Sequence, residues 1–224
     1  MSVQQLALAD ELILLAHREG DGKQLIPNNV LNISLTAAEL AELAALGRLK
    51  LRGADLAVVD RQPVGDAQLD SVLSQMGKVG KALPPSKWLI RINPLRKGRH
   101  YLQRLAERGA FKAGNSRVMG LFPIERYEYD DTELVRELTG RLGQVVRGRK
   151  PDARTVTLLA LTYHSGVLRQ LFAIDDEKRI GELVRDDWAG QAVKTYVDKT
   201  TRKAGDSGDM ATLLAAGGSS TGLS

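Results

Sequence analysis

The chain has 224 residues, of which 43% are hydrophobic and 26% charged, with a net charge of +5 and no cysteine. This composition is ordinary for a globular protein with a buried core, and the lack of cysteine excludes disulfide scaffolds, thiol nucleophiles and cysteine-ligated metals. His17, His100 and His164 lie far apart, without the spacing of metal ligands, so we expect no metal site and no cofactor.

Two helices are predicted before residue 47. Ser2 and Gln5 form a capping-box pattern ahead of a helix that continues to about residue 19. A second capping box, Thr36 with Glu39, predicts a helix that begins there and ends at Gly47. We expect no signal peptide, because the first 18 residues carry carboxylates within their apolar stretch and lack a basic start.

A short hairpin and a short helix follow. Residues 48–51 and 56–59 have the composition of two strands around a tight turn. Asp66 is expected to cap a helix with apolar residues at helical spacing. Gly77 and Gly80 lie near lysines, as in a phosphate loop, but their spacing fits no known phosphate-binding motif.

The segment from Ser71 to Ala106 contains eight basic residues and no acidic one. Asn93-Pro94 predicts the start of a helix that continues to Arg108, with cations on the face opposite its apolar residues. A concentrated basic surface typically faces nucleic acid or an anionic membrane. The eight cations are Lys78, Lys81, Lys87, Arg91, Arg96, Lys97, Arg99 and Arg104.

A second hairpin is predicted from strands 110–112 and 118–122 around Gly114-Asn115. Its second half is part of an apolar run, residues 118–124. An apolar loop beside a basic helix is typical of a peripheral membrane protein, because charge attracts it to the surface and buried side chains hold it there. Ordinary hairpin core is the alternative role for these side chains.

The last third is predicted to be helical. Asp131 begins one helix, and Asp152 caps a helix over 153–172 that is apolar nearly all round, which is typical of a central, buried helix. Another helix is expected over about 176–199. From Ala204 the composition changes to Gly, Ser, Ala and Thr, so residues 203–224 are predicted to be a disordered tail. The longest apolar run is too short to span a bilayer.

These elements predict a mainly α fold, a single helical domain over residues 1–202 around a buried central helix, with two short β-hairpins. An ordered series of segments over roughly residues 4–200 resembles the Golgi phosphoprotein 3-like family, in particular its shorter bacterial members. The segments are 40–49, 63–66, Leu69-Asp70, Trp88, 105–109, 121–123, 152–155 and 187–189.

The resemblance implies a single, mainly helical domain that binds membranes peripherally and has no established catalytic activity. Eukaryotic members recognise phosphatidylinositol 4-phosphate on the Golgi and help to retain glycosyltransferases. Their head-group site uses a tryptophan and an arginine, which align here with Pro27 and Thr36, so this half of the site is absent. Two further arginines of the family align near Leu95 and Gly98, and cations stand beside those positions.

The sequence therefore predicts a non-enzymatic protein on the cytoplasmic face of a membrane, bound to anionic phospholipid, with phosphoinositide head groups as the expected class. The expected head-group residues are Arg91, Arg96, Lys97, Arg99, His100 and Arg104. The expected membrane-inserting residues of the hairpin are Leu121, Phe122 and Ile124. A homo-oligomer and the cytoplasmic tails of membrane proteins stay open as further partners.

The alternative from another class is a winged-helix DNA-binding regulator, in which the basic helix would enter the major groove. The apolar hairpin would make a poor wing, and the long helices after residue 131 would need another purpose, so nucleic acid is the less favoured partner. Catalytic motifs are missing. The acid pairs at 175–176 and 186–187 fit helix starts or exposed helix faces, and His164 fits a core histidine.

Overall fold

The computed structural model describes residues 6–92, 97–118, 122–129 and 132–206, and over the second hairpin, residues 111–129, the description is confined to the backbone. Helices dominate it, which confirms the mainly α prediction. In chain order the helices and strands are α1 (Leu8–Leu15), α2 (Asn28–Ala45), β1 (Leu49–Arg52), β2 (Asp55–Val58), α3 (Ala67–Val79), α4 (Pro85–Arg91), α5 (Lys97–Glu107), β3 (Phe111–Val118), β4 (Phe122–Tyr129), α6 (Thr132–Val146), α7 (Ala153–Ser165), α8 (Val167–Leu171), α9 (Glu177–Val184) and α10 (Trp188–Asp206).

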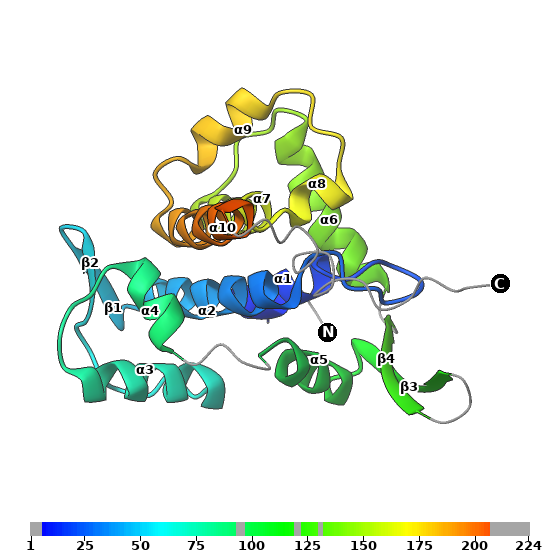
Figure 1. The fold of residues 1–224 in the computed structure, drawn as a ribbon, viewed down its shortest axis with the longest axis horizontal. Helices are drawn as coiled ribbons and strands as arrows, with labels where there is room; N and C mark the ends of the chain where they lie inside the picture. The colour runs from blue at the N-terminus through cyan, green and yellow to red at the C-terminus, as the bar shows by residue number, and fades with distance from the viewer. Residues whose placement is uncertain (1–5, 93–96, 119–121, 130–131, 207–224) are drawn as a thin grey trace.

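The helices form layers around α1 and α2 (Figure 1). Helices α7 and α10 cover one side of this middle layer, and α3 and α5 cover the other. The hairpin β1–β2 lies at one end of the molecule, and β3–β4 extends from the other end, directly after α5. No helix among the described residues is both long and apolar enough to cross a bilayer.

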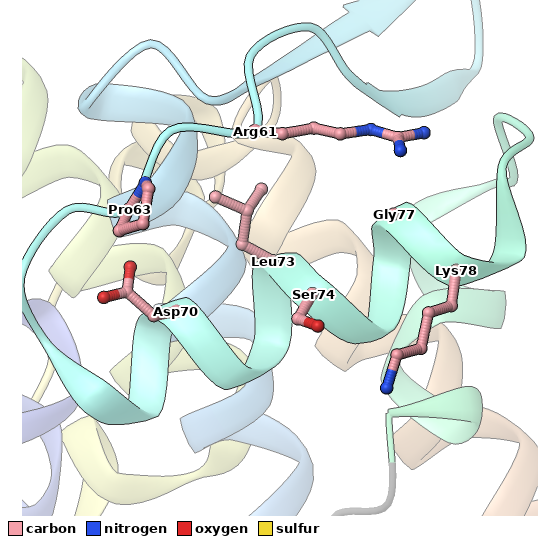
Figure 2. A pocket seen from close by; sticks show the side chains of 7 residues that line it. All are labelled: Arg61, Pro63, Asp70, Leu73, Ser74, Gly77 and Lys78. Carbon is pink, nitrogen blue, oxygen red and sulfur yellow. The ribbon is translucent and has the colours of Figure 1, made fainter.

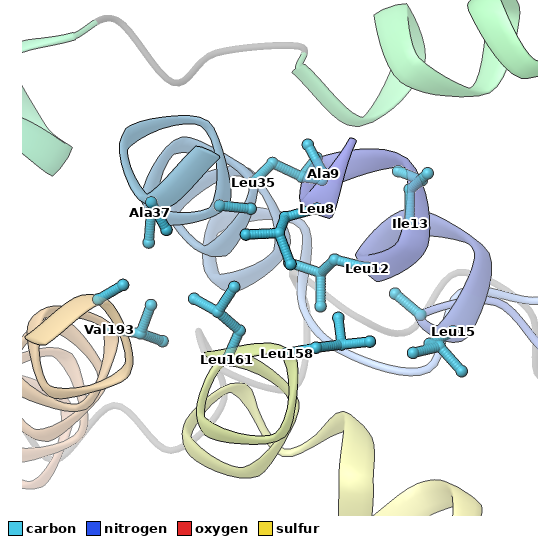
Figure 3. Close-up of a cluster of buried hydrophobic side chains, with 14 of the residues drawn as sticks. Leu8, Ala9, Leu12, Ile13, Leu15, Leu35, Ala37, Leu158, Leu161 and Val193 are labelled. Carbon is cyan, nitrogen blue, oxygen red and sulfur yellow. The ribbon is translucent and has the colours of Figure 1, made fainter. Parts of the chain in front are cut away.

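The core is built mainly on α1 and α2. Every residue of α1 is buried, as are most residues of α2. Figure 3 shows leucines of these helices meeting Leu158 and Leu161 of α7 and Val193 of α10. The predicted central helix over 153–172 is instead two helices, α7 and α8, because Gly166 takes a left-handed conformation with φ of +90°. Helix α7 is nonetheless buried as predicted, because α1 and α2 pack on one side of it and α8, α9 and α10 pack around the rest.

Two predicted helix starts need revision. Thr36 is not an N-cap: it lies inside α2, where its hydroxyl donates to the carbonyl of Asn32 at 3.0 Å. The helix begins eight residues earlier because its apolar face is continuous from Val30 onwards. Helix α1 starts at Leu8, and the capping pattern at residues 2 and 5 lies outside the described residues. The predicted start at residues 93–94 also lies outside them, so α5 is described from Lys97.

Local capping signals further along the chain are confirmed. The Asp66 carboxylate accepts hydrogen bonds from the backbone amides of Gln68 and Leu69, both at 3.0 Å, and begins α3. The Asp152 carboxylate accepts from the amide of Thr155 at 2.7 Å and begins α7. These caps depend on neighbours two or three positions away, so the sequence alone is enough to predict them.

The first hairpin matches its prediction, but the second does not. β3 and β4 pair antiparallel from Phe111↔Tyr129 to Val118↔Phe122. Gly114 and Asn115 therefore lie within β3 and are not the turn. The strand continues past them because β4 supplies residues of high β-propensity along its length, namely Phe122, Ile124, Tyr127 and Tyr129, which make a longer pairing available.

The predicted last helix over 176–199 is two helices, α9 and α10. Helix α9 ends at Val184 and α10 begins at Trp188. The Asp187 carboxylate accepts a hydrogen bond from the Gly190 amide at 2.7 Å, which caps α10. Helix α10 crosses α7 closely, since a Cβ placed on Gly190 would lie 2.6 Å from the Cβ of Ala160. It continues to Asp206, so the predicted domain boundary at residue 202 falls inside a helix, and residues 207–224 lie outside the described part.

Candidate functional site

The eight cations of the basic stretch have three different fates. Five are exposed: Lys78, Lys81, Lys87, Arg91 and Arg99. Lys97 and Arg104 are held by carboxylates inside the protein. Arg96 lies outside the described residues. The six predicted head-group residues are therefore not all on the surface: some are exposed, and Lys97 and Arg104 are bound to carboxylates in the interior.

Lys97 is a structural residue in this geometry. Its side chain is 6% exposed, and its ammonium lies 2.5 Å from a carboxylate oxygen of Glu39 on α2, whose side chain is 0% exposed. The Glu39 carboxylate also accepts from the hydroxyl of Tyr101 at 3.0 Å and from the amide of Gln68 at 2.9 Å. A lysine that neutralises a buried carboxylate cannot also offer its charge to a ligand outside, so assigning Lys97 to the head-group site was wrong.

Arg104 has a similar fate. Its side chain is 14% exposed, and its guanidinium pairs with the buried Asp10 of α1 and donates to the Asp66 carboxylate at 2.7 Å. It also lies over the ring of Tyr101, 4.6 Å from the centroid. Burial by itself would lower the pKa of Arg104, but the hydrogen bond and charge of Asp10 outweigh it, and the pKa is raised. Because Arg104 joins α5 to α1 and to the start of α3, its place in the predicted site is also corrected.

The exposed residues of the predicted site lie at the start of α5 and on α4. Arg99 and His100 are exposed in the first turn of α5. This turn is anchored on α2, since the amide of Gly98 donates to the side-chain oxygen of Asn32 at 2.9 Å. Arg91 is exposed at the end of α4, the helix that precedes α5 in the chain.

Helix α4 presents an unusual outer face. Its inner side chains, Trp88 and Leu89, are buried, and the indole nitrogen of Trp88 donates to the carbonyl of Leu56 at 3.0 Å. Its outer face carries Ile90, which is 63% exposed, next to the exposed Lys87 and Arg91. An isoleucine between two cations combines an apolar contact with positive charge on one helix face.

The positions that the family uses for its first head-group pair carry no comparable chemistry here. Pro27 precedes the first turn of α2, and Thr36 is fully buried inside it. Of the predicted membrane-inserting residues, Phe122 and Ile124 lie in β4. Leu121 lies outside the described residues, between two strands that are paired up to Val118 and Phe122.

A second buried charge cluster was not predicted. Glu11 of α1 is fully buried and pairs with Arg141 of α6 and with Arg154 of α7, at 3.0 Å in the latter case. Arg154 also pairs with Glu42 of α2 at 3.2 Å. Burial raises the pKa of Glu11 although both arginines act to lower it. The available signal was a carboxylate inside an otherwise apolar helix, which requires a buried cation as partner.

His164 is half-buried between α7 and α10, where its ring nitrogen lies 3.5 Å from the side-chain nitrogen of Gln191. Burial, and then the nearby charge of Lys194, lower its pKa to about 4. It is therefore neutral at physiological pH. Within the described ranges, no three His, Asp or Glu side chains are grouped so as to hold a metal ion.

Comparison with known proteins agrees with this architecture. No curated protein matches the chain significantly. A family model described as Golgi phosphoprotein 3 (GPP34) matches residues 8–200, which extend from the first residue of α1 into α10. The chain therefore belongs to the Golgi phosphoprotein 3 (GPP34) family.

Proposed function

We propose that this protein is a non-enzymatic, peripheral membrane protein that binds anionic phospholipid on a cytoplasmic membrane face. The observation that carries the proposal is the position of Arg91, Arg99 and His100. They are exposed at the end of α4 and in the first turn of α5, the next helix along the chain, and the hairpin β3–β4 follows directly after α5. Family membership supports a lipid-binding role of this kind.

The physical argument combines two attractions. Each lysine or arginine near an anionic surface contributes about 1 kcal/mol, and salt screens this contribution. An apolar side chain that becomes fully buried in the bilayer contributes about 1.5–3 kcal/mol, which salt does not screen. Ile90 on α4 and Phe122 on β4 are the proposed sources of the second contribution.

Head-group preference should follow net charge more than phosphate position. The family site needs two side chains at positions that carry Pro27 and Thr36 here, and the buried Thr36 cannot reach a ligand outside. Since Lys97 and Arg104 are engaged by carboxylates, only part of the basic stretch remains to coordinate a phosphate. Phosphatidylinositol 4-phosphate is then one anionic lipid among several. Cytoplasmic tails of membrane proteins and a second copy of the chain remain proposals.

Vesicle flotation with a matched charge control tests the proposal. The double variant Arg91→Glu, Arg99→Glu should lose at least about tenfold in affinity for phosphatidylserine vesicles, since four units of charge change near the surface. The control Lys178→Glu, Arg185→Glu makes the same charge change on exposed residues at α9, on the opposite side of the middle layer (Figure 1), and should bind normally. Equal loss in both double variants, or no binding by the unmodified protein, would refute the proposal.

Two further arms separate the alternatives. Phe122→Ser should weaken vesicle binding most at high salt, where the electrostatic contribution has faded. If folded Phe122→Ser protein binds normally, the hairpin does not insert. A mobility shift with duplex DNA at the same salt addresses the winged-helix alternative, which would replace the membrane proposal if DNA binds and vesicles do not.

A further inference from the structure

A pocket of about 340 Å³ lies between α3 and the segment that precedes it, and its lining includes none of Arg91, Arg99 and His100, which carry the proposed function. Its volume is within the range of about 300–1,000 Å³ that is usual for small-molecule sites. Figure 2 shows Arg61 extended above α3, whereas Ser74 and Lys78 project from α3 itself, with the Lys78 ammonium directed away from Arg61. Leu73 and Pro63 provide an apolar wall.

The charges in this pocket are unbalanced. Arg61 and Lys78 are both exposed, and within the part of the chain that the structure describes neither forms an ion pair. The one carboxylate in the lining, Asp70, is already engaged, because it accepts from the backbone amides of Val64 at 2.7 Å and Gly65 at 3.2 Å. Asp70 therefore shapes the loop that forms the pocket, and because it keeps its negative charge, the lining with Arg61 and Lys78 carries a net charge of +1.

Gly77 helps to hold Arg61 in place. A Cβ placed on Gly77 would lie 3.7 Å from the Nε of Arg61, so the arginine side chain lies directly against this turn of α3. Its guanidinium is directed past the turn that also carries Lys78 (Figure 2). Gly77 and Lys78 therefore belong to a helix that packs against Arg61 of the preceding segment, and they do not form a phosphate-binding loop.

We propose that this pocket binds a phosphate monoester. An arginine fork and a lysine ammonium offer several donors to a doubly charged phosphate, and arginine matches its oxygens in pairs. The exposed Lys78 side chain can turn toward Arg61 when the anion binds, the hydroxyl of Ser74 on the same helix adds a donor, and Leu73 with Pro63 contacts the organic part of the ligand. A soluble metabolite and a lipid head group, such as phosphatidic acid, share this chemistry.

The soluble arm titrates glycerol 3-phosphate into the full chain and follows the backbone amide signals of Ser74 and Gly77 by NMR. Saturable shifts are expected for the unmodified protein. The variant Arg61→Gln, Lys78→Gln should raise the Kd by about tenfold or more, since it removes both charge-assisted contacts. The control Lys50→Gln, Arg52→Gln makes the same charge change on β1 and should leave the Kd unchanged.

The lipid arm compares vesicles containing phosphatidic acid, a monoester, with vesicles of equal surface charge containing phosphatidylglycerol, a diester. A preference for the monoester that Arg61→Gln, Lys78→Gln abolishes indicates a lipid source, whereas binding of glycerol 3-phosphate alone indicates a soluble one. The pocket proposal is overturned if neither monoester binds, or if the pocket variant and the β1 control behave alike. General binding to anionic vesicles tests the proposed function separately, because that surface lies on α4 and α5.

Discussion

Removing the ammonium of Lys97 tests whether this residue belongs to the fold or to the ligand site. In Lys97→Met, the donors left to the buried Glu39 carboxylate among the described residues would be two neutral ones, Tyr101 at 3.0 Å and Gln68 at 2.9 Å. Leaving a buried charge without its ionic partner costs about 3–5 kcal/mol. For a chain of this size the loss corresponds to a fall of about 6–20 °C in Tm.

A double-mutant cycle adds a second substitution, which removes the Glu39 charge that Lys97 compensates. Lys97→Met combined with Glu39→Gln leaves a neutral amide that can still accept from Tyr101, so most of the lost stability should return. Replacing both partners of a buried pair is often close to neutral. The coupling between the two positions, measured by urea denaturation, should then be about 2 kcal/mol or more.

Vesicle flotation of the same variants decides between the two roles. The folded double variant should bind anionic vesicles as well as the unmodified protein, because the Lys97 ammonium is not on the surface. A stable Lys97→Met protein that had lost vesicle binding would refute this reasoning and return Lys97 to the head-group site.

Three further outcomes are expected. Gly190→Ala should destabilise the protein by about 1–3 kcal/mol through overpacking against α7, whereas Gly140→Ala, where a Cβ meets nothing within 4 Å, should stabilise it slightly, both by thermal denaturation. The pKa of His164 is lowered from 6.5 to about 4, so the free energy of unfolding should decrease as the pH falls from 6.5 toward 4. After allowance for the partial exposure of the ring, the decrease is about 1–2 kcal/mol. His164→Gln should remove this pH dependence from denaturation curves recorded across the same range. Ile90→Ser should weaken vesicle binding several-fold at high salt, whereas Leu46→Ser, also on an exposed side chain, should not; equal effects would count against α4 as a membrane contact.

Short-range features of this protein can be read from its sequence. The caps at Asp66 and Asp152, the first hairpin and the mainly helical class all depend on residues within a few positions of one another. Their energies are local, so the pattern is sufficient. The family resemblance was equally accessible, because it rests on the order of short segments along the chain.

The roles of the basic residues depended on tertiary structure. A helical pattern places Lys97 and Arg104 on a polar face, but it cannot show that Glu39 lies 58 positions away in sequence and Asp10 lies 94 positions away, both buried against that face. The carboxylates within the apolar helices α1 and α2 indicated that cations must pair with them in the core, but not which lysines or arginines these are. Only the packing of α5 on α1 and α2 decided that Lys97 and Arg104 stabilise the fold while Arg91 and Arg99 remain exposed. The physical reason is that a buried carboxylate requires a charged partner at contact distance, and the path of the chain determines which cation is near enough.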